Sequence, residues 1–119
     1  MYAAANVVAG IVALIHVYIL VLEMFLWERP LGLKAFGMDE NFAAATRILA
    51  ANQGLYNGFL AAGLFWSMYT GDIHAQRFFL GCVATAGVYG ALTADAKILW
   101  IQAAPAVVGL VLLGFVPSY

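Results

Sequence analysis

Charged residues are scarce in this chain of 119 residues. Five Lys and Arg and six Asp and Glu account for 9% of the sequence, whereas apolar residues account for 66%. Soluble domains contain about 25% charged and about 45–50% apolar residues. So few charges cannot cover a surface that faces water, and the sequence therefore predicts a protein embedded in lipid. Its balanced charge, without a basic patch, excludes a nucleic-acid-binding module, and its hydrophobicity excludes a disordered chain.

Cysteine and catalytic motifs are also lacking. The single Cys82 excludes a disulfide scaffold and a thiolate zinc site. His16 and Glu23 are two helical turns apart, not the one turn of a helical di-metal motif, so we expect no metal site. No glycine-rich phosphate loop follows a strand, and no serine is placed for a catalytic triad. The chain also lacks a cation before its first apolar run, so we expect that run to be retained rather than cleaved as a signal peptide.

Long apolar segments fill the rest of the sequence. A membrane-spanning helix requires about 20 predominantly apolar residues. Four segments meet this requirement, at about residues 3–27, 42–69, 76–93 and 97–115. The sequence therefore predicts an all-α fold, a bundle of four transmembrane helices that forms a single integral membrane domain over residues 1–119.

Cations near the ends of these segments predict the orientation. Arg29 and Lys34 lie in the first link, Arg47 follows soon after it, and Lys97 lies in the third link, whereas the second link holds only Arg77. Segments rich in Lys and Arg stay on the inner side of a membrane. The first and third links are therefore expected inside, and both termini on the outer side.

The first link, residues 28–38, combines helix breakers with apolar side chains. Pro30, Gly32 and Gly37 interrupt helices, and the apolar residues between them prefer the headgroup boundary to water. We therefore expect this link to lie along the inner interface. Asp39, just after it, is placed to cap the second long helix, because its carboxylate accepts hydrogen bonds from amides at the helix start.

Polar side chains inside the apolar segments are the candidate functional residues, because a polar group at membrane depth is costly and usually has a partner or a task. His16 and Glu23 are seven residues apart, about 700°, and so lie within about 20° of one helix face. The other segments carry the candidates Asn52, Gln53, Tyr56, Asn57, Tyr89 and Gln102. We expect these polar stripes to converge inside the bundle.

Counting residues from the inner boundary places Glu23 and Arg47 at one level, some 6–8 Å inside the membrane at about 1.5 Å per residue. A lone charge there is destabilising, so the two are predicted to form an ion pair at the inner mouth of a polar cavity that closes near Asn57. Alternatively, this pair only clamps the first two helices. His16 is either a buried structural histidine or a proton carrier or ligand-orienting donor.

Structural roles are also open for several other candidates. Gly54 and Gly58 form the small-residue pattern of closely packed helices, which serves either the bundle itself or a homodimer contact. Gln53 and Asn57 are either ligand contacts or hydrogen-bonding groups between helices. Tyr89 is either part of a site or a packing aromatic.

Three stretches carry a family resemblance: residues 16–27 (HVYILVLEMFLW), 49–64 (LAANQGLYNGFLAAGL) and 102–106 (QAAPA). They resemble the Domain of Unknown Function 1304 (DUF1304) family of small bacterial and fungal membrane proteins, over nearly the whole chain. The resemblance implies a multi-pass, four-helix protein of a bacterial inner membrane. The resemblance implies no established reaction, although some members are labelled epimerases and the family is distantly similar to DoxX-type membrane proteins, which are associated with quinone-linked redox chemistry. The matching motif positions are His16, Glu23, Asn52, Gln53, Tyr56, Asn57 and Gln102.

Three classes of function fit these observations. The favoured expectation is a protein that binds or transports a small or amphiphilic ligand through an intramembrane polar pocket, with Glu23, Arg47 and His16 handling protons or the ligand. The first alternative is a membrane-embedded enzyme that acts on a lipid or quinone headgroup, with His16 or Glu23 as general base. The second is an accessory subunit that docks into a larger membrane complex through its small-residue faces. A homodimer is compatible with all three.

Overall fold

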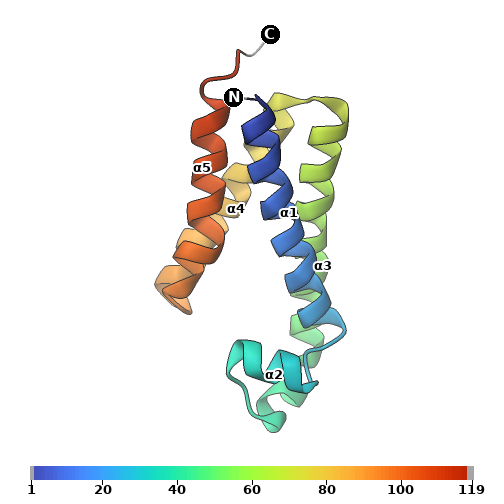
Figure 1. Ribbon diagram of the computed structural model, residues 1–119. Helices are drawn as coiled ribbons and strands as arrows, with labels where there is room; N and C mark the ends of the chain where they lie inside the picture. The colour runs from blue at the N-terminus through green and yellow to red at the C-terminus, as the bar shows by residue number, and fades with distance from the viewer. Residues whose placement is uncertain (1, 118–119) are drawn as a thin grey trace. The chain divides into compact units, whose positions relative to one another are not determined.

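The computed structural model describes residues 2–117, which form helices joined by short turns (Figure 1). The elements in chain order are α1 (Tyr2–Met24), α2 (Pro30–Phe36), α3 (Glu40–Thr70), α4 (Ile73–Thr93), the π-helix η1 (Leu99–Ala103) and α5 (Ala104–Leu113). This part of the chain contains no strand. The predicted all-α fold is therefore confirmed.

The chain divides into two compact units. Unit 1 comprises Met1–Leu14 and Leu60–Tyr119, and unit 2 comprises Ile15–Phe59. Helices α1 and α3 each contribute one part to each unit, because the boundaries at residues 14 and 60 fall inside these helices.

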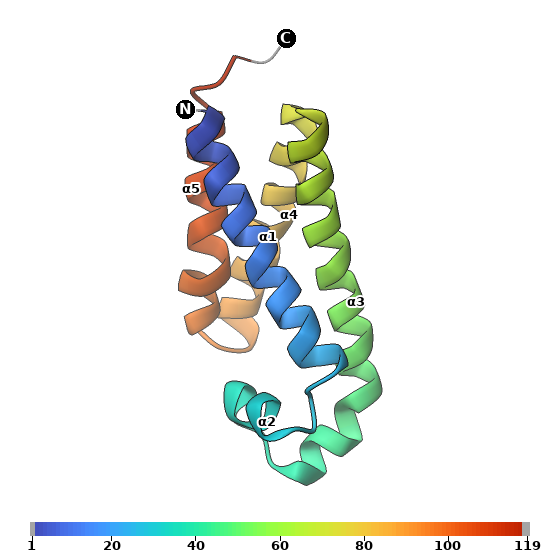
Figure 2. The ribbon, with the colours of Figure 1, turned by 45° about the vertical axis from the view of Figure 1, so that its right-hand side comes forward.

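Unit 1 packs four helical segments around small and branched apolar side chains. The first part of α1, the last part of α3, α4 and α5 lie side by side in both views (Figures 1 and 2). The buried core consists of Ala5, Ala9, Val12, Ala13, Ala61, Leu64, Leu80, Val83, Ala106 and Leu113. Half of these residues are alanines, which allow the helix backbones to approach closely.

Gly87 allows α4 and η1 to pack closely, because it has no side chain at their contact. A Cβ atom at this position would lie 2.7 Å from the backbone nitrogen of Ala103 and 2.8 Å from the Ala103 Cβ. Both distances are shorter than van der Waals contact. A side chain at position 87 would therefore push η1 away from α4.

Pro105 explains why η1 is a π-helix. In a regular α-helix the proline ring would clash with the carbonyl of Ile101, and its nitrogen has no hydrogen to donate to that carbonyl. The chain instead forms a wider turn, in which the N–H of Ala104 donates to the carbonyl oxygen of Leu99.

Arg77 closes the C-terminal end of α5. Its Nη2 donates to the carbonyl oxygens of Leu113 at 3.0 Å and Val116 at 3.3 Å. The last carbonyls of a helix lack intrahelical partners and carry the negative end of the helix dipole. A guanidinium group therefore stabilises this helix end.

The variant Arg77→Met is expected to lower the free energy of unfolding by about 2 kcal/mol, because hydrogen bonds from a charged donor are lost. Amide hydrogen exchange of residues 110–116 in detergent micelles should accelerate, and the midpoint of thermal unfolding should fall. The control is Lys97→Met, because the Lys97 side chain is 79% exposed and its ion pair with Asp95 is long, at 3.8 Å between Nζ and Oδ2. Equal effects of the two substitutions would contradict the capping role.

Unit 2 contains the second part of α1, helix α2 and the first part of α3 (Figure 2). The N–H of Phe42 donates to Oδ1 of Asp39 at 2.7 Å, so the predicted cap of α3 is confirmed. Trp27 Nε1 donates to Oγ1 of Thr46 at 3.1 Å. This bond attaches the turn after α1 to α3.

Residues 30–36 form the short helix α2, which the sequence reasoning missed because it treated this link as helix-breaking. Pro30 lies in the first turn, where its missing N–H costs no hydrogen bond. Gly32 is buried, and a Cβ there would clash with the carbonyl of Leu26. Gly37, with φ of 62°, ends the helix in the left-handed conformation. Each supposed breaker thus occupies a helix position that suits it.

By length and composition, α1 meets the criteria for crossing a membrane, with a mean hydropathy of 2.4. It is the single helix in residues 2–117 that does so, and the apolar stretch Leu99–Leu113 is shorter. The four spanning helices and the location of the termini therefore stay predictions.

Candidate functional site

Glu23 and Asn57 form a polar contact between α1 and α3 in unit 2. Asn57 Nδ2 donates to Oε1 of Glu23 at 2.6 Å, and the bond is partly buried. Hydrogen bonds to an ionised carboxylate are shorter and stronger than those between neutral groups. Because 34 residues separate the partners in sequence, this contact exists only in the folded chain.

Two glycines bring the backbones of α1 and α3 together at this contact. A Cβ at Gly54 would lie 2.5 Å from Met24 Cγ and 3.1 Å from Glu23 Cβ, and a Cβ at Gly58 would lie 2.7 Å from Leu20 Cδ1. The two helices are antiparallel here, because the earlier residue of α1 faces the later residue of α3. The small-residue pattern therefore packs helices of one chain, which was one of its two predicted uses.

The predicted ion pair between Glu23 and Arg47 was wrong. Arg47 Nη1 instead lies 3.9 Å from Glu28 Oε1, with both side chains largely exposed. The prediction extended the first helix to residue 27, but α1 ends at Met24. Glu23 consequently faces Asn57, and Arg47 lies ten residues away along α3, about 15 Å. The predicted polar cavity, with its mouth at Glu23 and Arg47 and its closed end near Asn57, depended on this ion pair and therefore stays a prediction.

Asn52, Gln53 and Tyr56 lie on the exposed side of α3. They are rotated about 160°, 100° and 160° from the buried Gly54 at about 100° per residue. The ring of Tyr56 contacts that of Phe59 edge-on at 5.7 Å between centroids. The predicted convergence required these three candidates to face Glu23, and the fold does not bring them there.

His16 is fully buried in the α1 part of unit 2. It shares a helix face with Glu23 but lies seven residues earlier, about 10 Å along the axis. The structure therefore does not bring the imidazole into contact with the pair formed by Glu23 and Asn57.

The remaining two candidates lie in unit 1. Gln102, in η1, donates from Nε2 to the carbonyl oxygen of Val83 at 3.3 Å and so connects η1 to α4. Tyr89 is 70% exposed on α4. Within residues 2–117, neither side chain forms a hydrogen bond with a second candidate.

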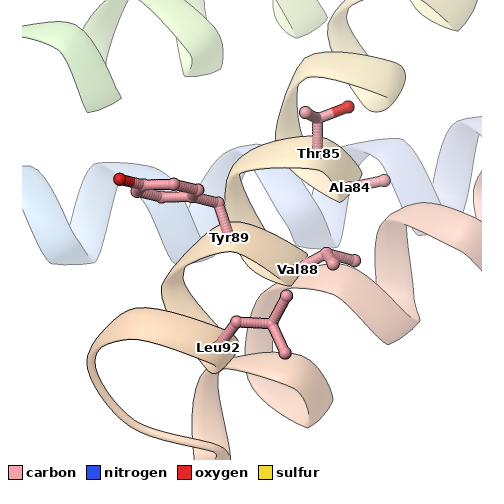
Figure 3. A pocket seen from close by; sticks show the side chains of 5 residues that line it. All are labelled: Ala84, Thr85, Val88, Tyr89 and Leu92. Carbon is pink, nitrogen blue, oxygen red and sulfur yellow. The ribbon is translucent and has the colours of Figure 1, made fainter.

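Tyr89 borders a shallow depression on α4. Figure 3 shows its lining residues, Ala84, Thr85, Val88, Tyr89 and Leu92. The ring of Tyr89 points to one side of the helix, and the side chains of Ala84, Val88 and Leu92 point to the other (Figure 3). The Thr85 hydroxyl donates to the Gly81 carbonyl at 2.8 Å. The depression therefore offers an apolar surface rather than a polar site.

A pair of carboxamides in unit 1 was missed by the sequence reasoning. Gln76 is fully buried, and its Nε2 donates to Oδ1 of Asn6 at 3.1 Å. Oε1 of Gln76 has no hydrogen-bond partner within residues 2–117. The sequence contains one signal for this pair. Asn6 and Gln76 lie near the starts of the first and third apolar segments, and in an up-and-down bundle these two starts lie at the same end.

These features define an all-α protein with a carboxyl–carboxamide contact between two closely packed antiparallel helices. Residues 2–117 contain no group of three His, Cys, Asp or Glu that is arranged to hold a metal ion.

The chain belongs to the family described as "Protein of unknown function (DUF1304)", whose model matches residues 10–114. The resemblance found in the sequence is therefore confirmed. The chain is also similar to the "Uncharacterized protein YpaA" of Lactococcus lactis subsp. lactis (strain IL1403), with 30% identity over 105 residues, covering 85% of this chain and 88% of the relative. No solved structure matches the chain.

Proposed function

We propose that the protein is a multi-pass integral membrane protein in which α1, α3, α4 and the continuous segment η1–α5 cross the bilayer. The distribution of side chains supports this proposal. Large apolar residues such as Ile48, Leu92 and Trp100 are 77%, 82% and 72% exposed, whereas polar His16 and Gln76 are fully buried. Extensive apolar surface is unfavourable in water but favourable in hydrocarbon.

The segments differ in how well their lengths match the thickness of the hydrocarbon core. Helix α3 has 31 residues and is about 46 Å long, whereas the hydrocarbon core is about 30 Å thick. It must tilt or extend beyond the core. The 15 residues of η1–α5 are shorter than the core, which local thinning of the bilayer accommodates. The excess of Lys and Arg in the first and third links supports termini on the outer side.

Within the bilayer, the carboxyl group of Glu23 binds a proton or, in exchange for it, a small amphiphilic cation. The observation that carries this proposal is the bond from Asn57, a neutral donor, to Oε1 of Glu23. No ion pair to Glu23 occurs within residues 2–117. A carboxylate in a low-dielectric environment requires a nearby positive charge or a proton. Because residues 2–117 supply no fixed cation to Glu23, a proton or a mobile cation takes this role.

The test uses tetraphenylphosphonium, a lipophilic cation, and the purified protein in lipid nanodiscs. Binding should strengthen as the pH rises, because the proton and the cation compete for one carboxylate. Glu23→Gln should weaken binding at least about tenfold, a loss of about 1.4 kcal/mol, because it removes the charge and keeps an oxygen that accepts from Asn57.

Glu28→Gln is the matched control, because it removes the same charge from a side chain that is 44% exposed in the same unit. Its affinity should stay within about twofold of the original, as expected for a screened surface charge. Tetraphenylborate, an anion of similar size, measures unspecific partition into lipid. Equal binding by the Glu23→Gln and Glu28→Gln variants would overturn the proposal, and so would wild-type binding that does not depend on pH.

A further inference from the structure

Four exposed residues form one continuous patch on α3: Leu49, Asn52, Gln53 and Tyr56. Their spacing of three, four and seven residues from Leu49 places them on one side of the helix. Leu49 and Tyr56 are 69% and 56% exposed. We call these residues the 49–56 patch.

The patch faces away from the contact that α3 makes with α1. That contact uses Gly54, Asn57 and Gly58, as described above. Leu49 and Tyr56 are rotated about 140° and 160° from Gly54 at about 100° per residue. The patch is therefore free to contact another molecule while the α1 contact is kept.

The two carboxamides in this patch lack hydrogen-bond partners in the part of the chain that the structure describes. Neither Asn52 nor Gln53 makes a side-chain hydrogen bond within residues 2–117. Both lie near the middle of Glu40–Thr70, far from either helix end. In a bilayer this position is distant from water, and an unsatisfied amide there costs free energy.

We infer that the 49–56 patch is the contact surface of a homodimer, an inference that rests on the membrane location proposed above. A carboxamide carries both a donor and an acceptor, so the same patch on a second copy satisfies it across a two-fold axis. The patch contains no charged residue, so two copies meet without repulsion. Leu49 and Tyr56 add apolar area around the hydrogen bonds, as interhelical contacts in membranes require.

Disulfide cross-linking locates the contact. Single cysteines are placed at the four patch positions and at Ile48 and Leu55 in a Cys82→Ala background, in vesicles of phosphatidylcholine and phosphatidylglycerol. Ile48 and Leu55 are also exposed, at 77% and 43%, but border the patch beside Asn52, about 90° and 110° from its centre at about 100° per residue. Oxidation should form covalent dimers much more efficiently from Leu49, Gln53 and Tyr56 than from these two controls. Equal cross-linking at all positions would reflect random collisions and overturn the inference.

The strength of the contact is measured by energy transfer between labelled copies as the protein is diluted with lipid. Replacement of both Asn52 and Gln53 by Leu should raise the dissociation constant about tenfold or more, because interhelical hydrogen bonds are lost. Asn52→Gln with Gln53→Asn keeps both carboxamides and should retain most of the affinity. Ile48→Ala should have no effect.

Two outcomes overturn the inference. One is a wild-type protein that is monomeric in vesicles at all dilutions, including a monomer that retains a bound lipid at the patch. The other is a dimer that the Leu double variant leaves unchanged. Alkali extraction of the vesicles separates this failure from that of the proposed membrane location: a monomer that resists extraction contradicts only the dimer, whereas a protein that is released contradicts both.

Discussion

Gly87→Ala is expected to lower the free energy of unfolding by about 2–3 kcal/mol, the usual range for overpacking of a rigid contact. The added Cβ would lie 2.7 Å from the backbone nitrogen of Ala103. A backbone atom cannot move aside as the end of a flexible side chain does, so η1 must shift as a whole. That shift also lengthens the bond from Gln102 to Val83. Reversible unfolding in mixed detergent micelles, followed by circular dichroism, measures the loss.

Gly81→Ala provides the matched control on the same helix. A Cβ at Gly81 would have no neighbouring atom within 4 Å. Alanine favours the helix over glycine by about 1 kcal/mol, so this variant should be as stable as the original or slightly more stable. A similar loss of stability at both positions would show that the Gly87 effect is not caused by the contact with Ala103.

Asn57→Leu is expected to destabilise the protein by about 3 kcal/mol, because it leaves the Glu23 carboxylate partly buried without its hydrogen bond. Glu23→Met should cost about 1–2 kcal/mol, because only a neutral amide loses its partner. The double variant removes both polar groups and should lie within about 1 kcal/mol of the original, since an apolar pair fits an apolar surrounding. The same unfolding assay measures all four proteins.

The double-mutant cycle therefore predicts a coupling energy of about 3 kcal/mol or more between Glu23 and Asn57. Glu23→Gln should recover most of the stability lost in Glu23→Met, because the amide oxygen still accepts from Asn57. Additive effects of the two substitutions would contradict an energetic role for the bond at 2.6 Å.

Hydropathy and local signals predicted several features correctly. The long apolar segments indicated helices throughout, and Asp39 was correctly identified as the cap of α3. The paired glycines at positions 54 and 58 were correctly associated with close helix packing. These features depend on residues near one another in sequence, so a single sequence contains the information needed to predict them.

The partner of Glu23 was beyond the reach of the sequence for a geometric reason. Hydropathy does not distinguish the last turn of a helix from an apolar turn that follows it, so the first helix was extended past Met24. An error of three residues at the end of a helix shifts the expected position of its side chains along an antiparallel neighbour by about 4.5 Å, nearly one turn. That error contributed to the choice of Arg47 over Asn57.

The composition of this chain by itself determined an apolar, helical protein in which the rare polar groups need partners, because the balance of apolar and charged residues fixes which surroundings are favourable. The tertiary structure alone decided which groups meet. Asn57 reaches Glu23, Asn6 reaches Gln76, and Asn52 and Gln53 remain exposed. The rotation and relative height of packed helices select among these partners, and both depend on contacts between residues far apart in the sequence.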